Sequence, residues 1–329
     1  MTRRQFMLSA AAAGLLGTAT HAQPASKTAK AGVLINGSPG PTIDTLRMGF
    51  AKLGYIEGQG FALEPRYAQG QLNRLPALAA ELVQLDVGVI LALGGPASRA
   101  ARNATSTIPI VFSIVTDPVV LGLAASMDRP GGNATGITSL DPEQAVRQFE
   151  LIRALFPKLT RIGILSDATI PGVDSSGLAP IERANDAAAR KLGMQPVIVK
   201  LSDGPSPDLA GPLDGMVKDG VEALLVLEVP IPFNNRKAVA ELAAALRLPT
   251  IFPGGQSDAG GLITYGTSVA DTWPRMPIIA DKILKGAKTA DLAVETATRR
   301  ELIVNLKAAR ALGLTVPDEF MKRADHVIE

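Results

Sequence analysis

The stretch VGVILALGGPASR, residues 87–99, passes from a continuous apolar run into two glycines and a proline. An unbroken apolar run is typical of a strand buried on both faces of a parallel sheet. Pro96 suits the first turn of a helix, which residues 97–104 continue. The stretch therefore predicts a strand, a glycine-rich turn and a helix N-terminus, in that order.

A turn of this kind directs several backbone N–H groups towards one point, where the partial positive charge of the helix favours an anion. Its glycines match neither the G-x-G-x-x-G spacing of dinucleotide sites nor the G-x-x-x-x-G-K-[ST] spacing of phosphate loops, which disfavours a nucleotide. The alternative is that Gly94 and Gly95 only allow the chain to turn. The sequence leaves both interpretations open.

The same alternation of short apolar runs and amphipathic stretches continues along the chain. It predicts strands at residues 32–35, 61–67, 87–93, 108–114, 134–138, 161–166, 195–201, 223–228, 250–252 and 262–265. Further helices are predicted at residues 42–53, 72–85, 142–155, 178–192, 207–218, 237–246 and 272–284. Regular alternation of this kind indicates parallel sheets with helices on both faces.

The chain has 329 residues, of which 47% are hydrophobic, and its strands are too many for one compact open sheet. The pattern also restarts, because KAGVLIN at residues 30–36 and TRIGILS at 160–166 have the same design. We therefore predict an α/β fold with two doubly wound parallel-sheet domains joined by a hinge. Residues 30–135 plus about 265–290 would form the N-terminal lobe, and 136–264 plus about 291–329 the C-terminal lobe.

The first 22 residues differ from the rest of the chain. Arg3 and Arg4 precede a short apolar run at residues 8–19, and small residues flank a cut after Ala22. This segment is typical of a twin-arginine export signal, and its apolar run is too short to span a bilayer comfortably. We expect a mature protein that is free in the periplasm.

Composition excludes several classes of function. Cleavage after Ala22 would remove two arginines and no acid, so the formal charge of +2 would fall to zero, and no basic patch indicates nucleic acid. No later apolar stretch predicts stable membrane insertion. The chain has no cysteine, and its two histidines, His21 and His326, lie near the ends. We predict no catalytic residue, metal ligand or cofactor.

Eight motifs follow one another along residues 30–329. They are LGYIEGQ (53–59), RLPALAAELV (74–83), ATSTIPIV (104–111), DPV (117–119), RPGGNATG (129–136), AGGL (259–262), DKILKGAK (281–288) and VNLKAARALGLTVP (304–317). On these motifs the chain resembles the substrate-binding proteins of ABC transporters of the tryptophan/tyrosine-binding type. The resemblance implies the type I periplasmic-binding fold and an ABC permease as partner. The chain departs from the usual family pattern at residues 167–171, 229–235 and 253–257.

In the N-terminal lobe, candidate ligand-binding residues follow the predicted strands, because open α/β sheets bind ligands at the carboxyl ends of their strands. The glycine-rich turn offers backbone N–H groups and a hydroxyl to a ligand carboxylate, from Gly94, Gly95, Ala97 and Ser98. Ser38 is either a second hydroxyl for the ligand or a plain turn residue. Thr116 and Asp117 follow the next strand, and Asp117 either pairs with a ligand ammonium or caps a helix.

In the C-terminal lobe, three acids fall at or just past strand ends: Asp167, Glu228 and Asp258. Glu228 is the most informative of them, because it follows an apolar run, where a carboxylate is costly without a partner. Phe233 either covers an apolar part of the ligand or packs under its own loop. Aromatic residues make up 4% of the chain, which disfavours sugar binding by ring stacking.

These features predict the extracytoplasmic solute-binding protein of an ABC importer. We expect a monomer that captures a small amino acid-like or carboxylate-bearing ligand in an interdomain cleft and delivers it to a permease. Two alternatives remain open at this point. One is an exported two-domain α/β enzyme acting on a small carboxylate substrate, and the other is a sensory binding module.

Overall fold

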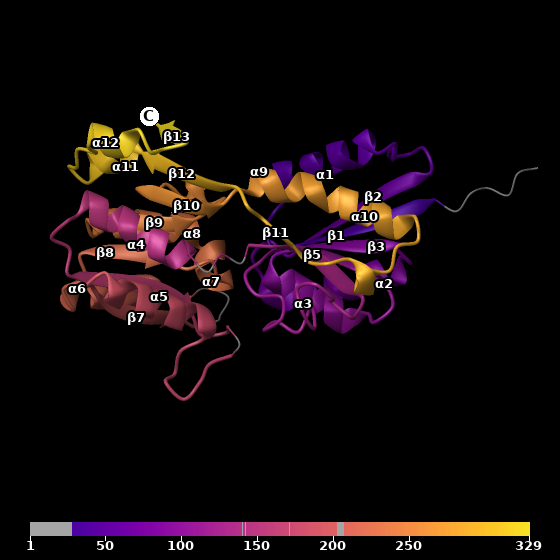
Figure 1. The fold of residues 1–329 in the computed structure, drawn as a ribbon, viewed down its shortest axis with the longest axis horizontal. Helices are drawn as coiled ribbons and strands as arrows, with labels where there is room; N and C mark the ends of the chain where they lie inside the picture. Colours follow the sequence, from indigo (N-terminus) through magenta and orange to yellow (C-terminus); the bar gives the residue numbers. More distant parts are fainter. Residues whose placement is uncertain (1–27, 140, 142, 171, 203–206) are drawn as a thin grey trace, which may run out of the picture.

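Two β-sheets lying side by side divide the molecule into two lobes (Figure 1). The computed structural model describes residues 28–139, 141, 143–170, 172–202 and 207–329 of the chain. The predicted signal segment, residues 1–22, lies outside the described residues. The predicted fold class, two α/β parallel-sheet domains, is confirmed.

The sheet of the first lobe has six strands in the order β11-β5-β4-β3-β1-β2, and its pairs are parallel. The strands are β1 (Ala29–Ile35), β2 (Phe61–Tyr67), β3 (Val89–Leu93), β4 (Ile110–Val115), β5 (Ala134–Thr138) and β11 (Glu295–Thr296). The strand order reverses between β1 and β3. Loops diverge at such a reversal and leave a crevice beyond the carboxyl ends of the strands.

Helices cover both faces of this sheet. They are α1 (Pro41–Lys52), α2 (Leu75–Gln84), α3 (Gly95–Ala104), α9 (Val269–Thr272) and α10 (Met276–Leu284), with short 3₁₀ turns η1 (Leu72–Arg74), η3 (Trp273–Arg275) and η4 (Thr289–Asp291). Apolar residues of α2 and α3 pack on one face, and those of α1 and α10 on the other. Figure 1 shows α10 beside α1, although more than 200 residues separate them in sequence.

The sheet of the second lobe has seven strands in the order β13-β12-β10-β9-β8-β6-β7. The strands are β6 (Arg161–Asp167), β7 (Gln195–Leu201), β8 (Ala223–Val226), β9 (Thr250–Pro253), β10 (Ile263–Thr267), β12 (Arg300–Asn305) and β13 (His326–Ile328). The five strands from β7 to β10 are parallel and repeat the order of the first lobe. β12 and β13 extend this parallel sheet beyond β10, and β12 runs antiparallel to β10. The predicted parallel arrangement therefore holds for the sheet except at this edge.

The helices of the second lobe are α4 (Gln144–Leu155), α5 (Pro180–Lys191), α6 (Ala210–Lys218), α7 (Pro230–Asn234), α8 (Arg236–Ala245), α11 (Leu306–Ala311) and α12 (Asp318–Met321), with a 3₁₀ turn η2 (Ser257–Ala259). Residues of α4, α5 and α11 share one apolar core, and those of α6 and α8 share the other. Among the described residues no helix has the length and apolarity needed to cross a membrane.

The predicted strands at 61–67, 134–138 and 195–201 coincide with β2, β5 and β7. The strand predicted at 223–228 ends at Val226, so Glu228 lies in the loop that follows. The sequence analysis missed α7, which interrupts this connection, the helices α11 and α12, and the edge strands β11, β12 and β13. Most of these elements carry too few residues for a periodic pattern to be recognised, but the six residues of β12 are as many as those of strands that were predicted.

The chain passes between the lobes three times, after β5, after β10 and after β11. Each passage lies C-terminal to the predicted boundary at 135/136, 264/265 or 290/291, because the strands continue to Thr138, Thr267 and Thr296 before leaving their sheets. Hydrogen bonds tie the passages together. The Ala297 N–H donates to the Thr138 carbonyl (3.0 Å), and the Ser268 hydroxyl donates to Glu301 (2.7 Å).

Candidate functional site

A cleft of about 1110 Å³ lies where the carboxyl ends of the strands of both lobes meet. The first lobe lines it with residues that follow β1, β3 and β4, and the second with residues that follow β6, β8 and β9. Eight predicted residues line the cleft: Ser38, Gly94, Gly95, Thr116, Asp117, Glu228, Phe233 and Asp258. Ala97, Ser98 and Asp167 do not line it and are buried within their lobes.

The glycine turn, Gly94–Gly95, connects β3 to α3. Gly94 has φ +89° and ψ 158°, a backbone conformation open essentially to glycine alone. None of the described hydrogen bonds uses the backbone N–H groups of Gly95 or Ala97, and Pro96 has no N–H. The helix therefore begins at the cleft with unused donors and a positive dipole end.

Ser98 does not offer its hydroxyl to the cleft, contrary to the prediction. The hydroxyl donates to the Gly94 carbonyl at 2.7 Å, and the residue is fully buried. Bonding of a serine side chain to the carbonyl four residues earlier is common in helices. The sequence pattern could not distinguish this arrangement from a side chain that points outward.

Arg99, one residue further along α3, is an exposed cation in the cleft lining that the sequence analysis missed. Among the described residues no hydrogen bond or ion pair occupies its guanidinium. An arginine on a helix surface resembles any solvated charge in a sequence. Only its position beside the glycine turn shows that it adds positive charge to this wall of the cleft.

The other predicted residues of the first lobe lie at the ends of β1 and β4. The Asp117 carboxylate accepts the backbone N–H groups of Val119 and Val120, each at 3.0 Å. Asp117 therefore caps the following turn, which is one of the two roles considered for it in the sequence analysis. Thr116 and Ser38 line the cleft nearby. Ile114, in a bulge of β4, has φ +54°, a strained value for a β-branched residue that also lines the cleft.

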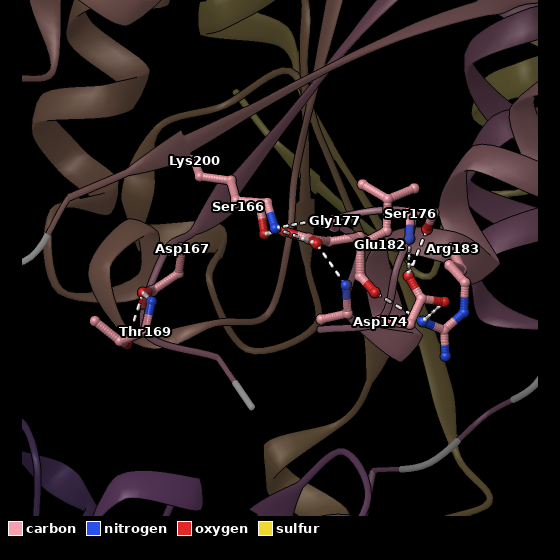
Figure 2. Close-up of polar contacts among 11 residues, drawn as sticks. Ser166, Asp167, Thr169, Asp174, Ser176, Gly177, Glu182, Arg183 and Lys200 are labelled. Carbon is pink, nitrogen blue, oxygen red and sulfur yellow. Dashed lines mark hydrogen bonds and ion pairs between the residues drawn. The ribbon is translucent and has the colours of Figure 1, made fainter. Parts of the chain in front are cut away.

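Asp167 supports the second lobe from inside. Its carboxylate accepts the backbone N–H and the hydroxyl of Thr169, each at 2.7 Å, as Figure 2 shows. The other oxygen accepts the N–H of Ile231 at 2.8 Å, in the first turn of α7. Asp167 therefore fixes the short helix α7 against β6 and is a positioning residue.

A buried ionic cluster anchors the long loop between β6 and α5 (Figure 2). The fully buried Glu182 carboxylate accepts the Ser166 hydroxyl (2.6 Å) and pairs with the Lys200 ammonium (2.8 Å). Lys200 also donates to the Gly177 carbonyl at 2.7 Å. The cluster holds the start of α5, where Ala179 and Pro180 line the cleft.

Asp258 and Phe233 share one partner, Arg236. The guanidinium donates to both carboxylate oxygens of Asp258, at 2.9 and 2.8 Å, and lies 5.1 Å from the centre of the Phe233 ring. The hydrogen-bonded guanidinium lowers the pKa of Asp258. Asp258 is therefore already paired, and Phe233 is packed against Arg236 on one side while it lines the cleft.

Glu228 lies in the cleft lining near the passages between the lobes, only partly exposed. Burial raises the pKa of Glu228 to about 7, although the Ser139 hydroxyl and the Arg300 guanidinium oppose the shift. Arg300 itself pairs with Asp141 at 2.7 Å. Glu228 is thus a poorly solvated carboxyl that a cation entering the cleft would stabilise in its ionised form.

Asn234 joins the two lobes across the cleft, a contact that the sequence analysis missed. Its side-chain amide donates to the Gly70 carbonyl at 3.2 Å, and its amide oxygen accepts the Asn36 side-chain N–H at 2.9 Å. Asn36 follows β1 in the first lobe, whereas Asn234 ends α7 in the second. The two residues are 198 positions apart, and nothing in a single sequence indicates that they form a hydrogen bond.

Comparison with known proteins identifies the family. The family described as ABC transporter substrate binding protein matches residues 39–328. The chain belongs to this family. Substrate-binding proteins are not enzymes and act outside the cytoplasm, so the chain binds a substrate and does not convert it. In the part of the chain that the structure describes, no cluster of three or more His, Cys, Asp or Glu residues could hold a metal ion.

Individual relatives agree with this assignment. The substrate-binding protein is 25% identical over 279 residues to the tyrosine-binding protein of Clostridioides difficile strain R20291, covering 83% of this chain and 78% of that one. It is similar to an ABC domain from Streptococcus pneumonia in complex with L-Trp, with a TM-score of 0.79, 26% identity and coverage of 92% and 100%. A conserved domain protein from Vibrio cholerae shares the fold, with a TM-score of 0.81 at 24% identity and the same coverage.

Proposed function

We propose that this substrate-binding protein captures a small amino acid-like or carboxylate-bearing ligand in the interlobe cleft and delivers it to the permease of an ABC importer. Export to the periplasm would follow the twin-arginine signal, with cleavage after Ala22. The mature protein would act as a monomer. The relatives that bind tyrosine and L-Trp support an amino acid as ligand.

The charges of the cleft carry the proposal. Asp141 and Asp258 are paired with arginines, whereas Asp117 accepts backbone N–H groups. Glu228 is left as the acid that is poorly solvated and only weakly compensated. It lies on the wall of the second lobe, opposite a first-lobe wall with unused N–H donors and the cation Arg99.

This distribution suits a ligand with a negative and a positive end. The carboxylate of the ligand would bind at the glycine turn, where the α3 dipole and the Gly95 N–H favour an anion. The ammonium would pair with Glu228. Phe233 and Ile114 offer apolar surface to the remainder of the ligand.

Binding of the twenty L-amino acids and of small organic acids is measured by thermal shift and calorimetry, because a ligand stabilises the folded protein according to its concentration over Kd. Glu228→Gln should weaken binding of an amino acid about ten- to a hundredfold, the range for a charge-assisted hydrogen bond. Asp258→Asn, which changes an acid already paired with Arg236, is the matched control. Equal losses in the two variants, or no binding by any of these acids, would contradict the proposal.

Transport and export need separate experiments. Uptake of the labelled ligand should fall in cells that lack the protein and return with the wild-type chain but not with a variant that cannot bind. Replacing Arg3 and Arg4 together by lysines should retain the precursor in the cytoplasm, and the mass of the mature protein should place the cut after Ala22. Unchanged secretion would favour the general export route.

A further inference from the structure

Three cleft-lining residues have a buried side-chain amide oxygen without a hydrogen-bond partner in the part of the chain that the structure describes. They are Asn36, Gln144 and Asn185. The same lining has one unpartnered side-chain nitrogen, that of Trp273. Buried acceptors without partners are destabilising, so this imbalance indicates a ligand that brings hydrogen-bond donors.

The orientation of the Asn36 amide is fixed by its neighbours. The Gly70 carbonyl can only accept, so Asn234 must face it with its amide nitrogen. The amide oxygen of Asn234 then faces Asn36, which must donate through its own nitrogen. This relay leaves the Asn36 Oδ1 atom as a free acceptor, on a side chain that is 6% exposed.

The strand register places Asn36 beside the glycine turn. Ile35 of β1 is paired with Leu93 of β3, so the next residues along the two strands are Asn36 and Gly94. Asn36 therefore lies at the end of the strand neighbouring the glycine turn, where a ligand carboxylate would meet the α3 N-terminus. In an α-amino acid, the ammonium is attached to the carbon that carries the carboxylate.

We propose that Asn36 is a specificity-determining residue whose Oδ1 atom accepts a hydrogen bond from the α-ammonium of the ligand, and that Asn234 is its positioning residue. The inference rests on the proposed function and adds an acceptor of the first lobe to Glu228 of the second. Both lobes then contact the α-amino group. Ligands that lack this group should bind less well, although they retain the carboxylate and side chain.

The test uses ligands that differ only in the α-amino group. L-tyrosine is paired with 3-(4-hydroxyphenyl)propionate, and L-leucine with 4-methylpentanoate. Asn36→Leu removes both the free acceptor and the bond to Asn234. Loss of the interlobe bond weakens both members of a pair alike, so only loss of the acceptor changes the ratio of their Kd values.

The expected result is that the preference for the amino acid over its deamino partner falls about tenfold in Asn36→Leu. Asn234→Ala should reduce the same preference by a smaller factor, because the Asn36 amide is then free to turn. Asn235→Ala is the matched control, since its side chain donates within its own lobe to the Ile231 carbonyl (2.8 Å). Its preference should equal that of the wild type.

Two outcomes overturn the inference, and they are distinguishable. If the wild type binds the amino acids but Asn36→Leu keeps the full preference, Asn36 does not recognise the α-amino group and the proposed function stands. If the wild type binds neither L-amino acid nor either deamino acid, while other compounds stabilise it, the amino acid function fails together with this assignment. Circular dichroism of each variant checks that it folds.

Discussion

The two walls of the cleft are built on the same strand order but present different chemistry. The first lobe contributes the glycine turn, uncharged polar side chains such as Asn36, and the exposed Arg99, which has no ion-pair partner among the described residues. The second lobe contributes charged side chains that are held by one another, such as Arg236 with Asp258. A repeated fold thus fixes where the loops meet but leaves each lobe free to supply a different kind of group.

The difference also lies in how the loops are held. The glycine turn between β3 and α3 in the first lobe is short, and it is fixed by backbone geometry and by the Gly94 N–H bond to the Ser113 carbonyl (2.8 Å). The loop from β6 to α5 in the second lobe is long, and side chains fix it from inside through Glu182 and Lys200. Side-chain substitutions should therefore disturb the second wall more than the first.

Among the substitutions that test this difference between the lobes, we expect Lys200→Met to have the largest effect on stability. The variant leaves the fully buried Glu182 carboxylate without its cation, and the Ser166 hydroxyl and the Ala179 N–H compensate only in part. We expect a loss of about 3 kcal/mol in the free energy of unfolding, measured by denaturant titration. The Glu182→Gln/Lys200→Met double variant should recover part of this loss.

Asp258→Asn is the control for that experiment, because it breaks an exposed ion pair of the same lobe. The Asp258 side chain is 50% exposed, whereas that of Glu182 is 0% exposed. Exposed pairs contribute little to stability, so we expect a change of less than about 1 kcal/mol. A Lys200→Met variant as stable as Asp258→Asn would show that the buried cluster does not hold the loop.

The same contrast explains what the sequence could predict. The glycine turn was found because a strand, two glycines and a proline are local features of the chain. Asp167 and Asp258 were placed correctly near strand ends, but their partners Ile231 and Arg236 lie far away in sequence. Whether an acid is free to bind a ligand depends on which distant residues lie beside it in the fold. A single sequence does not show these pairings.

A pH titration sharpens the comparison at Glu228. Burial raises the pKa of Glu228 from 4.5 to about 7, so between these values the folded state binds more protons than the unfolded state. Its contribution is therefore fully present below pH 4.5 and is lost as the pH rises through 7. We expect the ligand-free protein to lose about 2 to 3 kcal/mol of stability between pH 5 and pH 8.

Glu228→Gln should remove most of this dependence, measured as unfolding free energy at several pH values. His326, the one histidine among the described residues, is exposed near the chain end and remains in both proteins. A parallel pH dependence in wild type and variant would assign the effect to other groups. An ammonium ligand should oppose the loss, because it stabilises the ionised carboxylate.

Gly95→Val tests the wall of the first lobe. A Cβ atom at this position would lie 3.2 Å from the Leu121 side chain, and the additional methyl groups would occupy the approach to the α3 N-terminus. We expect affinity for the ligand to fall about ten- to a hundredfold, by calorimetry, since the anionic group loses its close approach. Gly215→Val, in the distant helix α6, controls for a valine in place of a helical glycine.

Ser98→Ala should have the smallest effect and separates backbone from side chain in the same wall. Its hydroxyl donates to the Gly94 carbonyl at 2.7 Å and lies outside the cleft lining. Removing it should cost about 1 kcal/mol of stability or less, because the acceptor keeps the Ser98 backbone N–H at 3.0 Å. Affinity should stay within about threefold of the wild type, since the Gly95 N–H and the helix dipole remain. If Ser98→Ala weakened binding as much as Gly95→Val, the hydroxyl would have to turn into the cleft when the ligand binds, and the glycine turn would recognise its ligand through a side chain as well as through its backbone.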